Sequence, residues 1–245
     1  MTVAPEAAEE ARATLLELFP DGFEEAETAS GVLLGAYTDG AGEERFRAAL
    51  GDARSEPVEP GWEDRWRAFH RPVRIGRLWV GPPWERPPLD AVALVVDPGR
   101  AFGTGAHPTT RLALELLLEL ERGSLLDVGC GSGVLAIAAA KLGFDPVYAV
   151  DVDPAAVEAT ETNAAANRVA VHAALVDGRR GHLPAADAAV ANIALDVVEA
   201  LAPSLDAETV ITSGYLEGER PELPGLAHVG GRVRDGWAAD LFRAK

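Results

Sequence analysis

The hydrophobic pattern of the chain is most regular after residue 90, where short apolar runs alternate with amphipathic stretches. Six apolar runs predict strands, at residues 91–96, 124–128, 147–151, 170–176, 186–192 and 208–213. Four stretches with helical periodicity predict helices, at residues 109–120, 134–142, 154–167 and 196–202. Apolar strands that alternate with helices are typical of a mostly parallel sheet covered on both faces. The sequence therefore predicts a doubly wound α/β fold, closed by a hairpin over residues 231–242 that turns at Asp235-Gly236.

The first 57 residues have a different pattern and predict a small α+β domain. Ala11, Leu15 and Leu18 share one face of a helix expected over residues 7–18. A strand is expected at residues 32–37 and a second short helix at residues 43–50. None of these elements carries a residue pattern that indicates catalysis.

Residues 58–90 are predicted to connect this domain to the regular part of the chain, residues 91–245. The connector holds four of the five tryptophans. Trp62 and Trp66 are four residues apart and share one helical face, where packing between elements is a simpler role than contact with a ligand.

Charge and cysteine content exclude several classes of function. With 22 basic and 39 acidic residues the net charge is −17. This charge disfavours nucleic-acid binding and suits a basic protein partner. The alternative interpretation is that the charge only keeps the protein soluble. Cys130 is the only cysteine, so an intramolecular disulfide and a cysteine metal cluster are excluded, and we expect no metal. The first ten residues are acidic, and no uninterrupted apolar run approaches the roughly 20 residues that span a bilayer. We expect a cytoplasmic protein without a signal peptide or membrane contact, and in the simplest case a monomer.

The strongest local motif is a glycine-rich turn between a strand and a helix, LLDVGCGSGVLAIAAAKLG at residues 125–143. Gly129, Gly131 and Gly133 permit a tight turn and let a ligand approach the backbone. Asp127 precedes the first glycine, where its carboxylate can accept a hydrogen bond from a ligand ammonium but would repel a pyrophosphate. The spacing D-x-G-x-G-x-G also differs from the G-x-G-x-x-G of dinucleotide-binding dehydrogenases, which disfavours a dehydrogenase.

Two further aspartates follow later strands at the same predicted edge of the sheet. Asp151 ends the strand at residues 147–151, where an acidic side chain binds ribose hydroxyls. Asp153 is in the better position to cap the helix that begins at Pro154, which leaves Asp151 for a ligand. Asp177 is placed equally well to reach an adenine amino group or to form a turn with Gly178.

Together these residues resemble the class I, seven-stranded methyltransferases. The resemblance implies a Rossmann-like seven-stranded sheet that binds S-adenosylmethionine across the carboxyl ends of its strands. Cys130 then lies inside the glycine turn, where a small residue is needed, and we expect no nucleophilic role for it.

Residues 61–85 and 97–114 resemble the ribosomal protein L11 methyltransferase family, PrmA. The phrase P-G-x-A-F-G-T-G-x-H-x-T-T is present at residues 98–110 with every fixed position. The resemblance implies methylation of lysine side chains and of an N-terminal amine on a ribosomal protein. Phe102 and Thr104 are then expected beside the cofactor, with the helix beginning near Thr109 as a donor to its carboxylate. His107 is open to two roles, a proton acceptor or a capping and packing residue.

Asn192 ends the strand at residues 186–192 and is expected to face the sulfonium of the cofactor in this fold. Its side-chain oxygen can accept a hydrogen bond from an incoming amine, so Asn192 is the predicted catalytic residue. Methyl transfer then depends on positioning and desolvation, without a dedicated base. Glutamine methyltransferases carry Asn-Pro-Pro-Tyr here, whereas this chain has Asn192-Ile193-Ala194-Leu195, which argues against a glutamine target.

Two departures from the PrmA pattern affect the expected substrate. The family's N-terminal recognition domain is a longer ferredoxin-like unit, and we expect its first strand to be missing because residues 5–10 are poor strand formers. Pro221 and Pro224 interrupt the helix expected after the fifth strand. The alternatives are a methyltransferase for a different protein lysine or a small amine, and a non-catalytic module that binds S-adenosylmethionine.

Overall fold

The computed structural model describes two compact units, Met1–Asp64 and Arg65–Lys245. The described residues are 1–4, 11, 14–15, 18, 24–28, 31–36, 38, 40–51, 55, 71–97 and 105–245. Trp62 and Trp66 lie outside them, as do Phe102 and Thr104. None of the helices in the described ranges is long and apolar enough to cross a bilayer.

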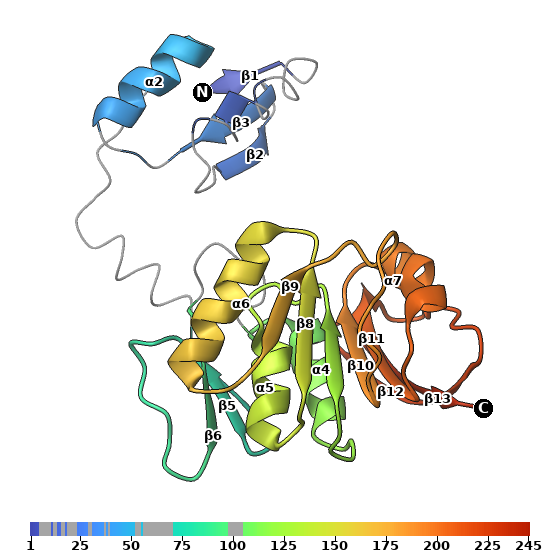
Figure 1. The fold of residues 1–245 in the computed structure, drawn as a ribbon. Helices are drawn as coiled ribbons and strands as arrows, with labels where there is room; N and C mark the ends of the chain where they lie inside the picture. The colour runs from blue at the N-terminus through green and yellow to red at the C-terminus, as the bar shows by residue number, and fades with distance from the viewer. Residues whose placement is uncertain are drawn as a thin grey trace. The chain divides into compact units, whose positions relative to one another are not determined.

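The first unit contains an antiparallel sheet with strand order β1-β3-β2 (Figure 1). Its elements are β1 (Thr2–Val3), β2 (Glu24–Thr28), β3 (Gly31–Gly35) and the helix α2 (Gly40–Leu50). The expected loss of the first strand was wrong, because Thr2 and Val3, just before the poor strand formers, pair with β3. β2 was not predicted, because its sequence EEAET holds three glutamates and no β-branched residue before Thr28.

The core of the first unit confirms the predicted helical face. Ala11 and Leu15, both helical, are buried in one cluster with Val32, Leu34 and Phe46. Leu18 packs against this cluster. The unit therefore has an apolar core of its own.

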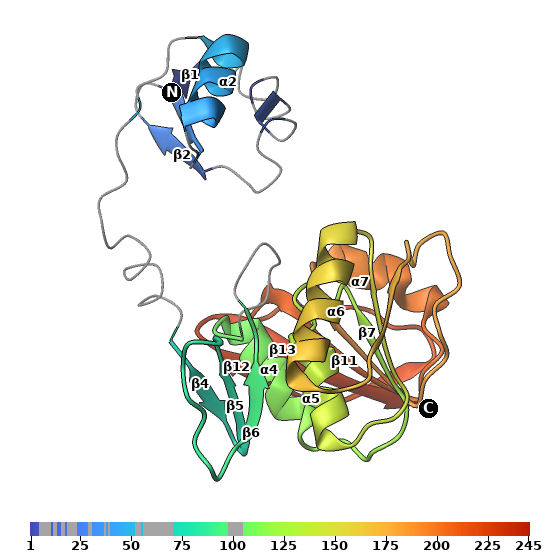
Figure 2. The ribbon, with the colours of Figure 1, turned by 60° about the vertical axis from the view of Figure 1, so that its left-hand side comes forward.

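The second unit begins with a small three-stranded sheet, in the order β4-β5-β6 (Figure 2). It consists of β4 (Val73–Ile75), β5 (Leu78–Gly81) and β6 (Val92–Val95), with β5 and β6 parallel. β4 and β5 lie within residues 58–90, which the sequence marked only as a connector. The strand expected at residues 91–96 belongs to this small sheet.

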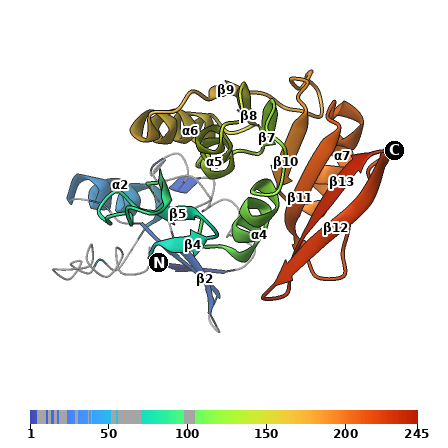
Figure 3. The ribbon, with the colours of Figure 1, turned by 90° about the horizontal axis from the view of Figure 1, so that it is seen from below.

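The main sheet has seven strands, in the order β12-β13-β11-β10-β7-β8-β9 (Figure 3). Five strands are parallel: β7 (Leu125–Val128), β8 (Val147–Asp151), β9 (His172–Leu175), β10 (Ala188–Asn192) and β11 (Thr209–Leu216). The hairpin β12 (Leu226–Arg234) and β13 (Trp237–Ala244) adds two antiparallel strands. Its turn residues Asp235 and Gly236 both have positive φ, 51° and 78°, as a tight hairpin requires. The predicted α/β class and the closing hairpin are confirmed.

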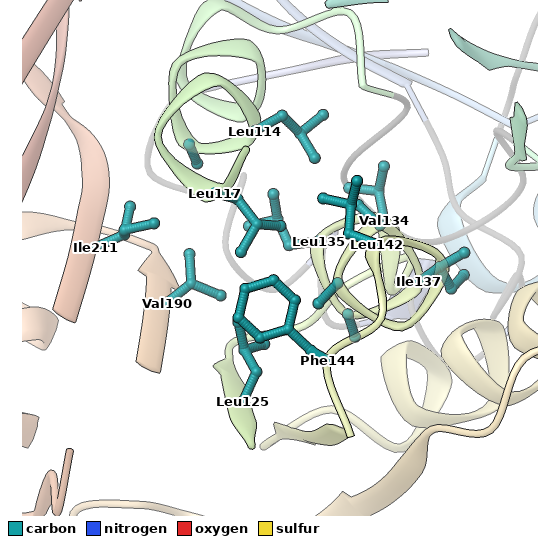
Figure 4. Packing of buried hydrophobic residues seen from close by; sticks show 14 of the residues in the cluster. Leu114, Leu117, Leu125, Val134, Leu135, Ile137, Leu142, Phe144, Val190 and Ile211 are labelled. Atoms are coloured by element: carbon teal, nitrogen blue, oxygen red, sulfur yellow. The ribbon is translucent and has the colours of Figure 1, made fainter. Parts of the chain in front are cut away.

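Helices cover both faces of the main sheet. Three pack on one face, α4 (Pro108–Leu117), α5 (Val134–Leu142) and α6 (Pro154–Asn167), and α7 (Leu195–Leu201) packs on the other. The larger core lies between the first face and these helices, where Leu114 and Leu117 of α4 meet Leu125, Val190 and Ile211 of the sheet (Figure 4). Residues 217–225 contain no helix, as the two prolines predicted.

Candidate functional site

A cavity of about 360 Å³ opens at the carboxyl ends of the central parallel strands. β7 lies between β8 and β10, so the strand order reverses there, which is where open α/β sheets bind ligands. The volume is in the range of small-molecule sites. The lining combines the glycine turn with polar side chains from three strand ends, among them Gly129, Gly131, Asp151, Asp177 and Asn192.

The glycine turn joins β7 to α5 and requires glycine at three positions. Gly129, Gly131 and Gly133 have φ of 73°, 53° and 78°, a region that disfavours other residues. A Cβ on Gly129 would also lie 2.4 Å from Cγ2 of Ile193. The turn is therefore narrow, and its backbone lines the cavity directly.

Asp127 lies beneath this turn and not among the residues that line the cavity. Its Oδ2 accepts a hydrogen bond from Ala136 N–H in the first turn of α5 at 3.0 Å, in place of a side-chain cap at Gly133. Its Oδ1 is buried and has no partner in the described part of the chain. Burial raises the pKa of Asp127 to about 7, and the neighbouring charge of Asp151 adds to the rise.

Asp151 lines the cavity at the end of β8 and is held by two backbone donors. Gly131 N–H donates to Oδ2 and Asp153 N–H donates to Oδ1, each at 3.0 Å. Asp153 caps α6 through Ala155 N–H at 2.9 Å, with Pro154 in the first helical turn. The capping role predicted for Asp153 is confirmed, and Asp151 remains directed toward the cavity.

Asp177 also lines the cavity, but its carboxylate is engaged by the turn that follows β9. Oδ1 accepts from Arg179 N–H at 3.1 Å, and Arg179 and Arg180 form ion pairs with the carboxylate. These hydrogen bonds and charges hold the pKa of Asp177 below its usual value. The turn-forming interpretation is present in the structure, and the position is also open to a ligand.

Asn192 ends β10 at the wall of the cavity. Its Nδ2 donates to Oγ1 of Thr110, a fully buried residue of α4, at 3.2 Å. Its Oδ1 is buried and has no partner among the described residues. The amide is therefore fixed through its nitrogen, while its oxygen lacks a hydrogen-bond donor in the described part of the chain.

Sequence reasoning missed Thr110 and Ile193 as supports of Asn192. Ile193 N–H donates to Ser213 O at 2.9 Å, and Gly214 lets the two strand ends approach, because a Cβ there would lie 2.3 Å from Ile193 O. The Thr-Thr pair of the motif was a usable signal for Thr110. Ile193 carried no such signal in the sequence.

Cys130 lies within the glycine turn and is buried. Its Sγ lies 3.3 Å from Oγ1 of Thr160. Burial raises the pKa of the thiol to about 12, so the reactive thiolate is scarce at neutral pH.

His107 caps α4 and packs against Trp237 at the edge of the core. Its Nδ1 accepts from Thr109 N–H at 3.4 Å, and its ring meets Trp237 edge-on at 4.9 Å. It is absent from the cavity lining, so the capping and packing role is the one that the geometry supports. The expected roles of Phe102 and Thr104 concern residues outside the described ranges.

A family model described as "Ribosomal protein L11 methyltransferase (PrmA)" matches residues 24–223 of the chain. A ribosomal protein L11 methyltransferase of Legionella pneumophila (strain Lens) is 39% identical over 204 residues, which cover 77% of this chain and 70% of that protein. One of Bordetella bronchiseptica is 38% identical over 252 residues, covering 92% and 79%. The crystal structure of a ribosomal protein L11 methylase from Lactobacillus delbrueckii subsp. bulgaricus is similar with a TM-score of 0.63 at 29% identity, over 72% of this chain and all of that one.

Proposed function

The chain belongs to the ribosomal protein L11 methyltransferase (PrmA) family, and from that premise we propose that it transfers methyl groups from S-adenosylmethionine to amino groups of a ribosomal protein, L11. The observation that carries the chemical part is the buried, unpartnered Oδ1 of Asn192 in the wall of the cavity. The substrate part rests on the relatives that bear this name.

The described residues fit S-adenosylmethionine in three respects. The narrow glycine turn exposes backbone to the cavity, which suits a ligand that lies flat against it. Asp151 ends β8 where a carboxylate can accept from ribose hydroxyls, and Asp177 is within the same cavity for an adenine amino group. Asp127 lies behind the turn with one oxygen free for a donor, directly or through water. Phe102 and Thr104 lie outside the described residues and join the proposed set through the sequence motif alone.

When bound, S-adenosylmethionine supplies a methyl group on a positively charged sulfur. The chain's own contribution is to position the acceptor. Asn192 Oδ1 accepts an N–H of the incoming amine, and Thr110 prevents the amide from turning its Nδ2 toward that amine. An orientation fixed in advance favours the reaction by removing the entropy cost of alignment.

The acceptor amine must be neutral before it can react. A lysine amine has a pKa of about 10.4 in water, and an apolar site lowers it by disfavouring the charged form. The lining includes Val128, Val134, Leu135, Ile193 and Val197, so the cavity is largely apolar beside Asn192. Among the described lining residues no histidine or lysine offers a base, which agrees with loss of the proton to solvent.

A basic protein substrate is supported by the distribution of charge. Residues 1–64 carry 16 acidic and 4 basic residues, a net charge of −12 out of −17 for the whole chain. This unit therefore attracts a cationic protein more strongly than the rest of the chain does. Because the proposed substrate is a ribosomal protein, we expect the reaction to take place in the cytoplasm.

The test is methylation of purified ribosomal protein L11 by the chain with labelled S-adenosylmethionine, followed by intact mass. Steps of one methyl mass are expected for the wild type. Asn192→Ala should lower kcat by about 100-fold or more, as removal of one well-placed polar partner does in other sites. Thr110→Val keeps the shape but frees the amide, so a smaller loss is expected.

The outcomes separate the parts of the proposal. If both variants bind S-adenosylmethionine as the wild type does, the loss of rate belongs to the acceptor step. If the wild type binds the cofactor but leaves L11 unmodified, the substrate is wrong, and another protein lysine or a small amine takes its place. If Asn192→Ala methylates L11 at the wild-type rate, the role proposed for Asn192 is wrong.

A further inference from the structure

Helix α6 buries a row of polar side chains where most helices bury apolar ones. Thr160, Asn163 and Asn167 are three and four residues apart, so they share one face, and they are 0%, 4% and 6% exposed. The buried apolar residues of this helix are two alanines, Ala156 and Ala164. Buried polar groups destabilise a fold unless they are hydrogen-bonded, so the partners of this row explain why it is there.

Two of these side chains hold the glycine turn from behind. Thr160 Oγ1 donates to Gly131 O at 3.0 Å, and Asn163 Nδ2 donates to Ser132 O at 2.9 Å. The carbonyls of two successive turn residues are therefore fixed by α6. On the other side, Gly131 N–H is held by Asp151 Oδ2.

Two of them also hold the end of β6. Asn163 Oδ1 accepts from Asp97 N–H at 3.1 Å, and Asn167 Oδ1 accepts from Val95 N–H at 2.9 Å. Asn167 Nδ2 donates back to Val95 O at 2.6 Å. β6 is an edge strand, and Val95 and Asp97 are alternate residues, so the two amides take the place of a neighbouring strand.

Within the described part of the chain, Asn163 is the member of the row whose side-chain hydrogen bonds reach both segments. We infer that Asn163 is a positioning residue for cofactor binding, because its single amide fixes the glycine turn at Ser132 relative to the end of β6 at Asp97. This inference rests on the proposed function, which places S-adenosylmethionine against that turn. Breaking the link leaves the turn with one fewer anchor, so the cofactor must order it on binding and loses affinity.

A purely structural role makes a different prediction. If the row only attaches α6 to the core, removal of either amide lowers stability and leaves cofactor affinity alone. Asn167 is the matched control, since it is equally buried on the same helix and binds β6 but not the glycine turn.

The experiment compares the full-length wild type with Asn163→Ala, Asn163→Asp and Asn167→Ala. Asn163→Asp keeps an acceptor for Asp97 N–H but, once ionised, cannot donate to Ser132 O. The dissociation constant for S-adenosylmethionine is measured by calorimetry, the free energy of unfolding by urea titration, and kcat at saturating cofactor with L11 as substrate. Both Asn163 variants should raise the dissociation constant about tenfold, with kcat at saturation close to the wild type.

Asn167→Ala should lower the free energy of unfolding by about as much as Asn163→Ala does, but it should change the dissociation constant for S-adenosylmethionine by less than about twofold. Equal dissociation constants for Asn163→Ala and Asn167→Ala would overturn the inference. A wild type that does not bind S-adenosylmethionine would instead overturn the proposed function, and the inference would fall with it.

Discussion

The buried carboxyl of Asp127 should make the second unit, Arg65–Lys245, less stable as the pH rises toward neutral. Its pKa is raised to about 7, mainly by burial, whereas an aspartate in an unfolded chain has a pKa of 3.8. Asp127→Asn is the perturbation that tests this. The amide oxygen can still accept from Ala136 N–H, and no charge is left in the core.

The sign and size follow from proton linkage. Between pH 4 and pH 7 the folded state holds a proton on Asp127 and the unfolded state does not. As the pH rises over this range, the free energy of unfolding therefore falls by about 1.4 kcal/mol per pH unit, and by about 4 kcal/mol in total. Below pH 4 and above pH 7 this group adds no further pH dependence. Asp127→Asn has no ionisable group at this position, so its free energy of unfolding should increase relative to that of the wild type as the pH rises.

Urea unfolding of both proteins at pH 5, 6, 7 and 8, followed by circular dichroism, measures the difference. The advantage of Asp127→Asn should grow from pH 5 to pH 7 and then level off. Asp187→Asn is the matched control, because the hydroxyl and backbone N–H of Ser124 hold the pKa of Asp187 below its usual value. Asp187 is therefore ionised in both the folded and the unfolded state from pH 5 to pH 8, and the stability difference between Asp187→Asn and the wild type should stay constant over this range. A difference between Asp127→Asn and the wild type that is constant within about 0.5 kcal/mol from pH 5 to pH 8 would refute the reasoning.

Three further predictions concern the strand ends, the hairpin and the substrate. Gly214→Ala forces a Cβ against the Ile193 backbone, so it should reduce kcat at least about tenfold in the methylation assay. Gly218→Ala is the control: Gly218 has a similar positive φ, but a Cβ there would meet open space, so this variant should keep the wild-type kcat. Asp240→Ala removes a buried carboxylate that is bound by the side chains of Tyr215, Arg220 and His228, and it should lower the free energy of unfolding in urea by about 3 kcal/mol. Asp90→Ala breaks only the exposed ion pair with Arg74, so it should leave the free energy of unfolding nearly unchanged. The association rate with L11 should fall about tenfold from low to high salt in stopped-flow measurements, and a rate independent of salt would contradict the electrostatic argument.

The elements that the sequence placed best are those with explicit end signals. α5 begins and ends as predicted because Gly133 and Gly143 both have positive φ at its ends. α6 begins as predicted because Asp153 caps it ahead of Pro154. Alternation of apolar runs was sufficient for the parallel strands, since both faces of the sheet are covered.

The parts that the sequence did not place depend on contacts between distant segments. β4 and β5 have a short pattern that tryptophan and proline content obscured, and they are strands because β4 pairs with β5 and β5 pairs with β6. The orientation of the Asp127 side chain could not be predicted either, because it depends on a hydrogen bond from Ala136 N–H in the first turn of α5. Asn192 was found from its strand end, but the fixed orientation of its amide comes from Thr110, 82 residues earlier.

The two orphaned oxygens connect the stability of the fold to its ligands. In the part of the chain that the structure describes, Asp127 Oδ1 and Asn192 Oδ1 are the buried side-chain oxygens without a partner. They lie at the ends of the neighbouring strands β7 and β10, and each buried oxygen without a hydrogen-bond partner costs about 1–3 kcal/mol until a ligand supplies one. The proposed ligands bring an ammonium and an amine, which are donors of the required kind. An ammonium near Asp127 would also favour its charged form, so saturating S-adenosylmethionine should flatten the fall in wild-type stability between pH 4 and pH 7. If the cofactor stabilises the protein equally at every pH, it binds without reaching Asp127, and the carboxyl serves only to cap α5.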